Sequence, residues 1–573
     1  MEIYYALHLD LRRHFIYLDF SFDSHGFESA HRPRNFLFLR DGDYRYFGVY
    51  RFPLEMTNWL FFLKRFWDIG WISIRLLLKR KITPEVRLRL FFEQSGGAFT
   101  KLGQILSLRH DLIPARYANE LLNLLSRVKV SSYSAMRQVF IDEVGQPPEV
   151  VFEKFESKPI ASASISQVYR AQLPDGTPVV VKIQRSGIRQ IFETDFLLAR
   201  WLGRGLGFFR LFNTFQIQDV VKEFITWSRR ELDFREELTN SQILARHSEN
   251  HPRTIIPRAY AEWSTERVLV SEDMAEIFSV ETVLKELEKN PKYRDELLIS
   301  HSIHAEELAY YFVFDIMRQY FIDGFFHADP HPANLFFASG NRLGYFDFGI
   351  VGQVGKTRLA LLRIIYGIAR RDLAFSSKHF LHFAKTAMAE EIDLFKLKEP
   401  DTYKRYAKVV GKLEEIMLDN LQLDLEGILT PWYEEKTLPN YQHLTSSLVF
   451  SRILLKTRDY QIYLPREVVI FFRTLVIADM VAVKLAPGFD IIRALNAFFA
   501  SYPLGVAEEL IMAKTQEIKL EEAADSTAHF SFEQLLEVKD AEKEQLGAAK
   551  ERLINIISAY AEDYEEIRQL LKA

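Results

Sequence analysis

The chain has 573 residues, of which 48% are hydrophobic and 26% charged, and its formal net charge is −4. This length allows several domains with a sizeable core, and the near-balanced charge gives no reason to expect a nucleic-acid partner. There is no cysteine, which excludes disulfides, cysteine zinc sites and cysteine nucleophiles. The first residues lack the apolar core of a secretory signal, and no uncharged apolar run reaches the roughly 18 residues of a membrane-spanning helix. We therefore expect a cytoplasmic protein without a signal peptide or transmembrane helix.

The N-terminal part of the chain has two sections. Residues 1–55 contain one strand candidate, 44–50, and no pattern to which a function can be assigned. Residues 56–145 are predicted to be a helical extension, in which aromatic and basic side chains recur at helical spacing between Trp59 and Lys81. This pattern suits a helix that lies in a membrane interface. A helix packed on the protein with a solvated basic edge explains it equally well.

Residues 146–275 have the pattern of the small, β-rich lobe of a kinase. The run Ala161-Ser162-Ala163-Ser164 takes the place of the loop that covers nucleotide phosphates. Pro174-Asp175-Gly176 predicts a hairpin turn. The next strand contains Lys182, in the position of the lysine that reaches the α- and β-phosphates.

A kinase lysine needs a carboxylate partner on a helix, and the acidic run 231–238 offers several. The spacing favours Glu237, with Glu236 as the second choice. Further on, a strand leads into a predicted hinge, where Glu272 and Met274 would lie against the adenine base.

Residues 276–500 contain the catalytic pattern of the larger, helical lobe. In the run His327-Ala328-Asp329-Pro330-His331-Pro332-Ala333-Asn334, Asp329 and Asn334 stand five residues apart, and Asp347-Phe348-Gly349 begins thirteen residues later. This is the spacing of a kinase catalytic loop and its metal-binding motif. Asp329 would face the nucleophile, while Asn334 and Asp347 would hold Mg²⁺ against the phosphates.

The same run contains two histidines four residues apart, His327 and His331, which raises the alternative of a histidine metal site. The neighbouring Pro330 and Pro332 prevent the helix that would place both rings on one face. We therefore favour the catalytic loop.

After Gly349 the chain departs from an ordinary protein kinase. Residues 356–371 already have the pattern of an amphipathic helix, and no Ala-Pro-Glu motif follows, so there is little room for a peptide-binding platform. The helix expected at 468–483 is interrupted by two charges and is read as buried. The tail, 501–573, is predicted to be helical and to pack against the kinase lobe, with a short coiled coil as the alternative.

The motifs in this order resemble those of the UbiB family of atypical kinases, the accessory proteins of ubiquinone biosynthesis. Lys101-Leu102-Gly103-Gln104 is similar to the family's K-x-G-Q, and Ala161-Ser162-Ala163-Ser164 to its alanine-rich loop. Glu231-Leu232-Asp233 is similar to its E-x-D, and residues 327–334 to its H-A-D-P-H-P-G-N. The resemblance covers about residues 95–490. It implies an α+β, two-lobed protein-kinase-like fold with added N- and C-terminal helices.

The resemblance also implies roles that spacing does not. Lys101 and Gln104 would belong to a helix that folds over the nucleotide pocket, where Lys101 contacts Glu231 and Asp233 and blocks protein substrates. Lys182 would pair with Glu237. ATP and Mg²⁺ are the implied ligands, and membrane surfaces and prenylated-quinone lipids the implied setting.

Three features of the chain differ from the family pattern. Ser162 replaces an alanine; its hydroxyl either donates to a phosphate or belongs to a tolerated small residue, and we favour the second explanation. Ala333 replaces a glycine, which costs about 1 kcal/mol if the backbone there has a positive φ. The C-terminal part lacks the membrane-spanning segments of some bacterial members, so any membrane contact should be peripheral, at the inner face.

The sequence therefore predicts an atypical kinase or ATPase that binds Mg-ATP and supports quinone or isoprenoid-lipid metabolism at a membrane surface. A catalytically silent nucleotide-binding scaffold or lipid-handling protein is the alternative. The candidate partners are an anionic lipid, a prenylated quinone or its precursor, a second copy of the chain, and quinone-biosynthesis proteins. A true protein kinase is disfavoured because the peptide platform is missing.

Overall fold

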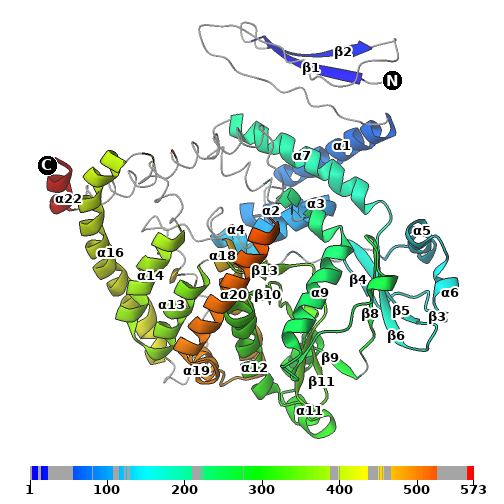
Figure 1. Cartoon of the computed structure of the whole chain (residues 1–573). Helices are drawn as coiled ribbons and strands as arrows, with labels where there is room; N and C mark the ends of the chain where they lie inside the picture. Colours follow the sequence, from blue (N-terminus) through cyan, green and yellow to red (C-terminus); the bar gives the residue numbers. More distant parts are fainter. Residues whose placement is uncertain are drawn as a thin grey trace. The chain divides into compact units, whose positions relative to one another are not determined.

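The structure is a computed structural model. It describes residues 3–10, 15–22, 56–79, 82–106, 115–121, 124, 130–208, 221, 224–226, 228–274, 276–355, 357–387, 398, 400–435, 449–450, 452–453, 456, 466–525, 547 and 564–572. The chain divides into two compact units, whose helices and strands are labelled in Figure 1. Unit 1 comprises residues 1–100 and 190–221, and unit 2 comprises residues 101–189 and 222–573. The strand predicted at 44–50 and most of the tail after residue 525, with the alternative of a coiled coil, lie outside the described residues.

Unit 1 contains a hairpin and several helices. Strand β1 (Ile3–Asp10) pairs antiparallel with β2 (Phe15–Phe22). The helices are α1 (Met56–Leu78), α2 (Pro84–Ser95), the start of α3 (Gly97–Leu106) and most of α7 (Ile188–Phe208).

The helices of unit 1 meet at the buried carboxylate of Asp195 on α7. It accepts two hydrogen bonds from Arg65 of α1, at 2.7 and 3.0 Å, and one from the Ala98 N–H of α3, at 2.9 Å. The last of these satisfies an N–H in the first turn of α3, which has no partner within its own helix. One acidic side chain thus ties three helices together.

The small lobe in unit 2 is an antiparallel sheet with its own hydrophobic core. The strand order is β3-β5-β6-β8, and β4 pairs with the start of β5, on the edge that β3 occupies at the end of β5. The elements are β3 (Lys154–Phe155), β4 (Ala161–Ser162), β5 (Ser166–Gln172), β6 (Pro178–Gln184), β8 (Val268–Glu272), α5 (Tyr133–Val144) and α6 (Pro148–Val151). Gly176, at φ +87°, makes the predicted hairpin turn between β5 and β6.

The helical lobe in unit 2 has a separate and larger core, built around α12 and α18. Its helices are α9 (Phe234–Ser248), α10 (Val280–Lys289), α11 (Tyr293–His301), α12 (Ala305–Arg318), α13 (Arg358–Arg370), α14 (Leu373–Ala387), α16 (Pro400–Glu435), α18 (Arg466–Leu485), α19 (Ile491–Ser501), α20 (Leu504–Asp525) and α22 (Glu565–Lys572). The short helix α4 (Ala115–Leu121) precedes the small lobe.

Short strands in the helical lobe carry the catalytic pattern. One sheet has the order β7-β12-β11-β9, made of β7 (Thr254–Ile255), β12 (Arg342–Tyr345), β11 (Leu335–Ala338) and β9 (Ile277–Ser279). Strand β10 (Phe325–His327) pairs with β13 (Val351–Gln353). Strand β10 thus leads into the catalytic run, and the antiparallel pair β11–β12 connects the run to Asp347.

The predicted two-lobed α+β class is confirmed, since unit 2 contains a β-rich lobe and a helical lobe with separate cores. The expected helix after the D-F-G motif is α13, which begins five residues after β13. The predicted extension 56–145 is divided between the two units. In the described parts of the chain, no helix is both long enough and apolar enough to span a membrane.

Candidate nucleotide site

Lys182 on β6 lies at the centre of a cluster of acids. Its Nζ donates to both carboxylate oxygens of Glu237, at 2.8 Å each, and lies 3.3 Å from Oδ2 of Asp347. The side chain of Glu237 is 8% exposed, whereas Glu236 faces solvent. Burial on the inner face of α9 explains why Glu237, and not the second choice, meets the lysine.

The charges of this cluster reinforce one another. Burial alone would lower the pKa of Lys182, but the carboxylates of Asp347 and Glu237 outweigh it and raise that pKa, so the ammonium group stays charged. Burial by itself would raise the pKa of Asp347. The Lys182 charge and the Gly349 N–H outweigh burial and lower this pKa to about 2. Burial raises the pKa of Glu237 to about 7, opposed by Lys182. Asp347 therefore remains ionised at neutral pH.

The catalytic loop fixes Asn334 and Asp329 together. A short 3-10 turn, Pro332–Asn334, ends the loop. The Asn334 amide nitrogen donates to the Asp329 backbone oxygen at 3.0 Å and lies 3.5 Å from its Oδ2. Because both neighbours are acceptors, the amide must present its NH₂ to Asp329, which turns its oxygen the other way. Ala333 lies in the turn and is absent from the described residues with positive φ, so the expected strain at this position is not present.

The donor set fits a magnesium ion. Mg²⁺ prefers oxygen ligands and usually keeps few protein ligands beside phosphates and waters. Asn334 offers an amide oxygen that has no hydrogen-bond partner among the described atoms, and Asp347 offers an ionised carboxylate. The alternative histidine site is not supported, since His327 is buried and His331 is exposed. Within the described residues, no group of three or more His, Asp or Glu side chains could hold a metal.

Asp329 has a second partner that the sequence did not predict. Arg473 of α18 donates from NH2 to Oδ1 of Asp329 at 2.7 Å. Oγ1 of the next residue, Thr474, lies 3.3 Å from the backbone oxygen of Ala328 and 2.9 Å from that of Ile470. The only signal in the sequence was a charge within an otherwise apolar helix.

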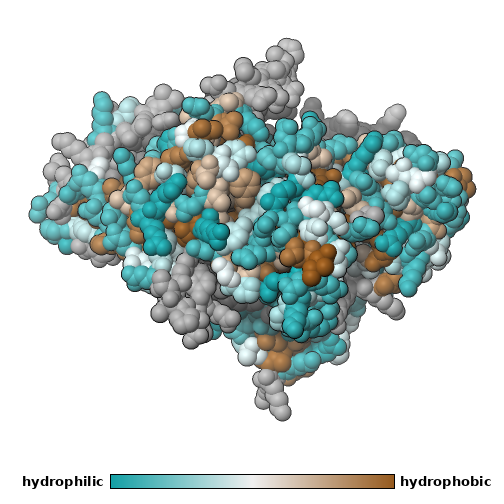
Figure 2. Space-filling model, turned by 90° about the horizontal axis from the view of Figure 1, so that it is seen from below, coloured by the Kyte–Doolittle hydropathy of each residue, from teal (hydrophilic) through white to brown (hydrophobic). Residues whose placement is uncertain are grey.

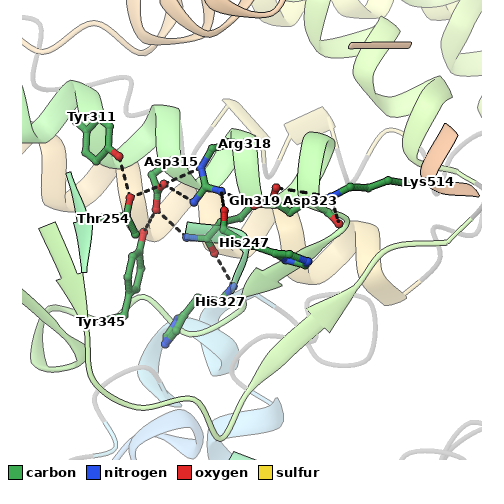
Figure 3. Close-up of polar contacts among 10 residues, drawn as sticks. All are labelled: His247, Thr254, Tyr311, Asp315, Arg318, Gln319, Asp323, His327, Tyr345 and Lys514. Carbon is green, nitrogen blue, oxygen red and sulfur yellow. Dashed lines mark hydrogen bonds and ion pairs between the residues drawn. The ribbon is translucent and has the colours of Figure 1, made fainter. Parts of the chain in front are cut away.

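A buried polar network supports the strand that leads into the catalytic loop (Figure 3). Gln319 accepts a hydrogen bond from the His327 N–H at 2.9 Å and donates to Oδ2 of Asp315 at 2.7 Å. Asp315, fully buried on α12, also accepts from Arg318 at 2.7 and 3.0 Å and from the Tyr345 hydroxyl at 2.8 Å. The network connects α12 to β10 and β12, so the catalytic loop begins from a fixed strand.

The alanine-rich loop is a tight hairpin between β4 and β5. The Ala163 N–H donates to the Ser166 oxygen at 2.9 Å, so this amide is used within the turn. Arg185 donates to the Ala163 oxygen at 2.9 Å, to the Ser162 hydroxyl at 2.6 Å and to the Ser131 hydroxyl at 2.9 Å. Ser162 therefore anchors the loop to Arg185. Ser164, the last residue of the predicted loop, is partly buried.

Lys101 on α3 pairs with only one of the two acids that the resemblance implied. Its Nζ lies 3.0 and 2.9 Å from the two carboxylate oxygens of Glu231. Asp233 instead caps the N-terminus of α9 and accepts from Arg235, whose backbone N–H, Nε and NH2 lie 3.0, 2.9 and 2.7 Å away. The expected contact between Lys101 and Asp233 is corrected accordingly, because local capping takes up both oxygens of Asp233.

The remaining predicted residues are less informative. Glu272 ends β8, and its N–H donates to the Arg258 oxygen at 2.8 Å. Met274 follows in the connection to β9 and is partly buried. Gln104 belongs to α3, but its side chain lies outside the described residues.

Two lobes, a lysine–glutamate pair on β6 and α9, and an aspartate–asparagine loop with its D-F-G motif together define a protein-kinase-like protein. The profile of the ABC1 atypical kinase-like domain matches residues 123–379. The chain therefore belongs to the family of ABC1 atypical kinase-like proteins, and the resemblance to UbiB is confirmed.

Three relatives illustrate the family. An uncharacterized protein of Synechocystis is 34% identical over 296 residues, which cover 51% of this chain and 70% of that protein. A probable protein kinase UbiB of Pseudomonas fluorescens is 34% identical over 301 residues, 51% of this chain and 53% of the relative. Protein ACTIVITY OF BC1 COMPLEX KINASE 7, chloroplastic, of Arabidopsis thaliana is 30% identical over 329 residues, 57% of this chain and 43% of the relative. The chain thus spans about half the length of the last two.

Among solved structures, the Rv3197–erythromycin complex from Mycobacterium tuberculosis matches with 22% identity and a TM-score of 0.43. The match covers 72% of this chain and 93% of that one.

Proposed function

We propose that this protein is an atypical kinase or ATPase that binds Mg-ATP and acts at a membrane surface in support of quinone or isoprenoid-lipid metabolism. The observation that carries the catalytic part is the assembly around Lys182, which bonds Glu237 at 2.8 Å and lies 3.3 Å from Asp347. Phosphoryl transfer from ATP in kinases requires a paired lysine and glutamate and a D-F-G aspartate that can hold Mg²⁺, and this assembly supports that reaction.

The proposed reaction assigns a role to each group. An acceptor hydroxyl or water attacks the γ-phosphorus, the bond to the bridging oxygen breaks, and ADP leaves with that oxygen. Asp329 receives the proton of the attacking group, and Lys182 binds the α- and β-phosphates. A magnesium ion on Asn334 and Asp347 would neutralise charge on the phosphate oxygens.

The acceptor is proposed to be a small molecule, a lipid or water, because the peptide platform is missing. Helix α13 begins at Arg358, soon after β13 ends at Gln353, and this interval is too short for an activation loop. The partly buried pair of Lys101 and Glu231 is a further obstacle to a protein chain.

The membrane part of the proposal rests on α1. Its exposed apolar residues recur every three or four positions along one face, and two of them, Trp67 and Trp71, are 74% and 61% exposed. The opposite face buries Ile69 and Leu76. The other members of the exposed stripe are Leu63, Phe66, Ile74, Leu77 and Leu78.

Basic side chains accompany this stripe, although fewer than the sequence indicated. Lys64, Arg75 and Lys79 are exposed, while Arg65 is engaged by Asp195. An aromatic stripe flanked by basic residues suits the interface of an anionic membrane. On the face seen in Figure 2, the coloured apolar residues form patches separated by hydrophilic ones.

The catalytic test is ATP turnover by the purified protein with Mg²⁺, compared with Asp347→Asn. Loss of a metal ligand should lower turnover on the order of 10²-fold or more. Nucleotide binding that depends on Mg²⁺, without turnover in either protein, would favour the silent scaffold.

The membrane test is co-sedimentation with vesicles that contain an anionic lipid. Trp67→Ala/Trp71→Ala should weaken binding by roughly tenfold or more, since each buried aromatic side chain contributes about 1.5–3 kcal/mol. Ile299→Ala on α11, where Ile299 is 81% exposed, is the matched control and should bind as the wild type does. Equal binding by all three proteins would contradict the role of α1.

A further inference from the structure

Helix α18 contacts the catalytic loop through two consecutive residues. Arg473 donates to the Asp329 carboxylate at 2.7 Å, and Oγ1 of Thr474, which lies 2.9 Å from the Ile470 backbone oxygen, also lies 3.3 Å from that of Ala328. The helix belongs to the core of the helical lobe, where Phe471 lies 3.9 Å from the ring of Tyr320. Its register against the loop is therefore set by packing, so the guanidinium group is delivered from a rigid element.

The placement of Arg473 has an energetic cost. Its Nε–H is buried and has no acceptor among the described atoms. Leaving a buried donor without an acceptor is destabilising. A helix that only needed to fill the core would be more stable with an apolar residue at this position. Local rules of this kind are broken mainly at functional sites.

The Asp329 carboxylate needs this donor in order to keep one orientation. Rotation of a carboxylate about its last side-chain bond has only broad, twofold minima. Within the loop, the Asn334 amide lies 3.5 Å from Oδ2, which is a weak restraint. The bond from Arg473 to Oδ1 is much shorter, at 2.7 Å, and is charge-assisted. The two side chains are 21% and 28% exposed, so water screens the pair only in part.

We propose that Arg473 is a positioning residue, which holds the Asp329 carboxylate in the orientation that receives the proton of the attacking acceptor. The inference rests on the proposed phosphoryl-transfer function. It assigns to α18 a role in the reaction, in addition to its role in the core. Arg473 acts through Asp329, so its loss should reduce kcat and leave nucleotide binding intact.

A double-mutant cycle tests this. In the wild-type background, Arg473→Ala should lower kcat for ATP turnover by roughly tenfold or more, while KM for ATP and the Kd for Mg-ADP change by less than about twofold. In the Asp329→Asn background, the same replacement should change kcat by less than about twofold, because the group it positions is already lost. Arg473→Lys keeps a charged donor and should recover part of the rate.

Lys484→Ala is the matched control, because Lys484 lies on the same helix in an exposed ion pair with Glu288. It should turn over ATP at the wild-type rate. Mg-ADP binding by Arg473→Ala shows that the variant is folded; should it not fold, Arg473→Lys takes its place in the cycle, with a smaller expected loss.

Three results would overturn the inference. They are an unchanged kcat in Arg473→Ala, an equal loss in both backgrounds, or a loss expressed in KM alone. Absence of turnover in the wild type would instead remove the proposed function, and the inference with it. The two failures are thus separate observations.

Discussion

Replacing Asp315 with asparagine is expected to destabilise the helical lobe by about 3–5 kcal/mol. The carboxylate is fully buried and accepts five hydrogen bonds. Oδ1 accepts from Arg318 and from Thr254, and Oδ2 accepts from Gln319 and from Tyr345 (Figure 3). All of these neighbours are donors, so an asparagine must point its own NH₂ at two of them.

The magnitude follows from which oxygen is replaced. If the NH₂ takes the place of Oδ2, two hydrogen bonds of about 1 kcal/mol each are lost and donors face donors. In the other orientation the NH₂ faces Arg318, whose side chain is fully buried. In both cases Arg318 keeps Asp323 and the His247 oxygen but loses a full negative charge. Breaking one side of a buried ion pair costs about 3–5 kcal/mol.

Urea denaturation followed by near-ultraviolet circular dichroism measures this loss. Asp295→Asn is the control, because Asp295 is exposed on α11, and it should lie within about 0.5 kcal/mol of the wild type. ATP turnover should fall in Asp315→Asn as well, since Gln319 connects Asp315 to the His327 N–H. A free energy of unfolding within about 1 kcal/mol of the wild-type value would refute the view that this network holds the catalytic loop.

Three further predictions concern single contacts. Ser162→Ala should cost about 1–2 kcal/mol in stability, because Arg185 loses an acceptor at 2.6 Å. Its nucleotide affinity should stay within about twofold of the wild-type value. A tenfold drop in affinity in a binding titration would instead show that the hydroxyl binds a phosphate. Lys101→Ala removes a positive charge that acts on both catalytic acids, so Mg²⁺ titrations should show tighter metal binding, and weaker binding would contradict this. Burial raises the pKa of Asp323 to about 6, so the stability that its protonated form contributes is present below about pH 4 and is lost as the pH rises through 6. Thermal unfolding should show the wild type losing about 3 kcal/mol of stability relative to Asp323→Asn between pH 4 and 7. Parallel stability curves for the two proteins would refute the shift.

The sequence predicted the site where motif spacing and chain order carry the information. Lys182 and Glu237 are 55 residues apart, yet the strand position of one and the helical position of the other follow from local pattern. Spacing also favoured Glu237 over Glu236, and of these two neighbouring helical residues only Glu237 is buried. The kinase-like fold was predictable for the same reason.

Pairings between distant helices were not predictable. Arg473 and Asp329 are 144 residues apart, and a single arginine in an apolar helix does not indicate which acid it meets. The anchoring of Ser162 by Arg185 was missed because it depends on how β4 folds back on β5. The contact expected between Asp233 and Lys101 was wrong. Asp233 is the N-cap of α9 and bonds Arg235, two residues away, in place of the distant lysine.

Three acids of the site each meet a cation from a different segment. Glu231 meets Lys101 of α3, Asp347 meets Lys182 of β6, and Asp329 meets Arg473 of α18. These pairs join segments from the start, the middle and the end of unit 2. Because an unpaired charge is costly in a partly buried site, no pair can form fully until its two segments have packed. The catalytic geometry therefore depends on the fold of the whole unit, and a motif of eight residues identifies the chemistry without containing the means to hold it in place.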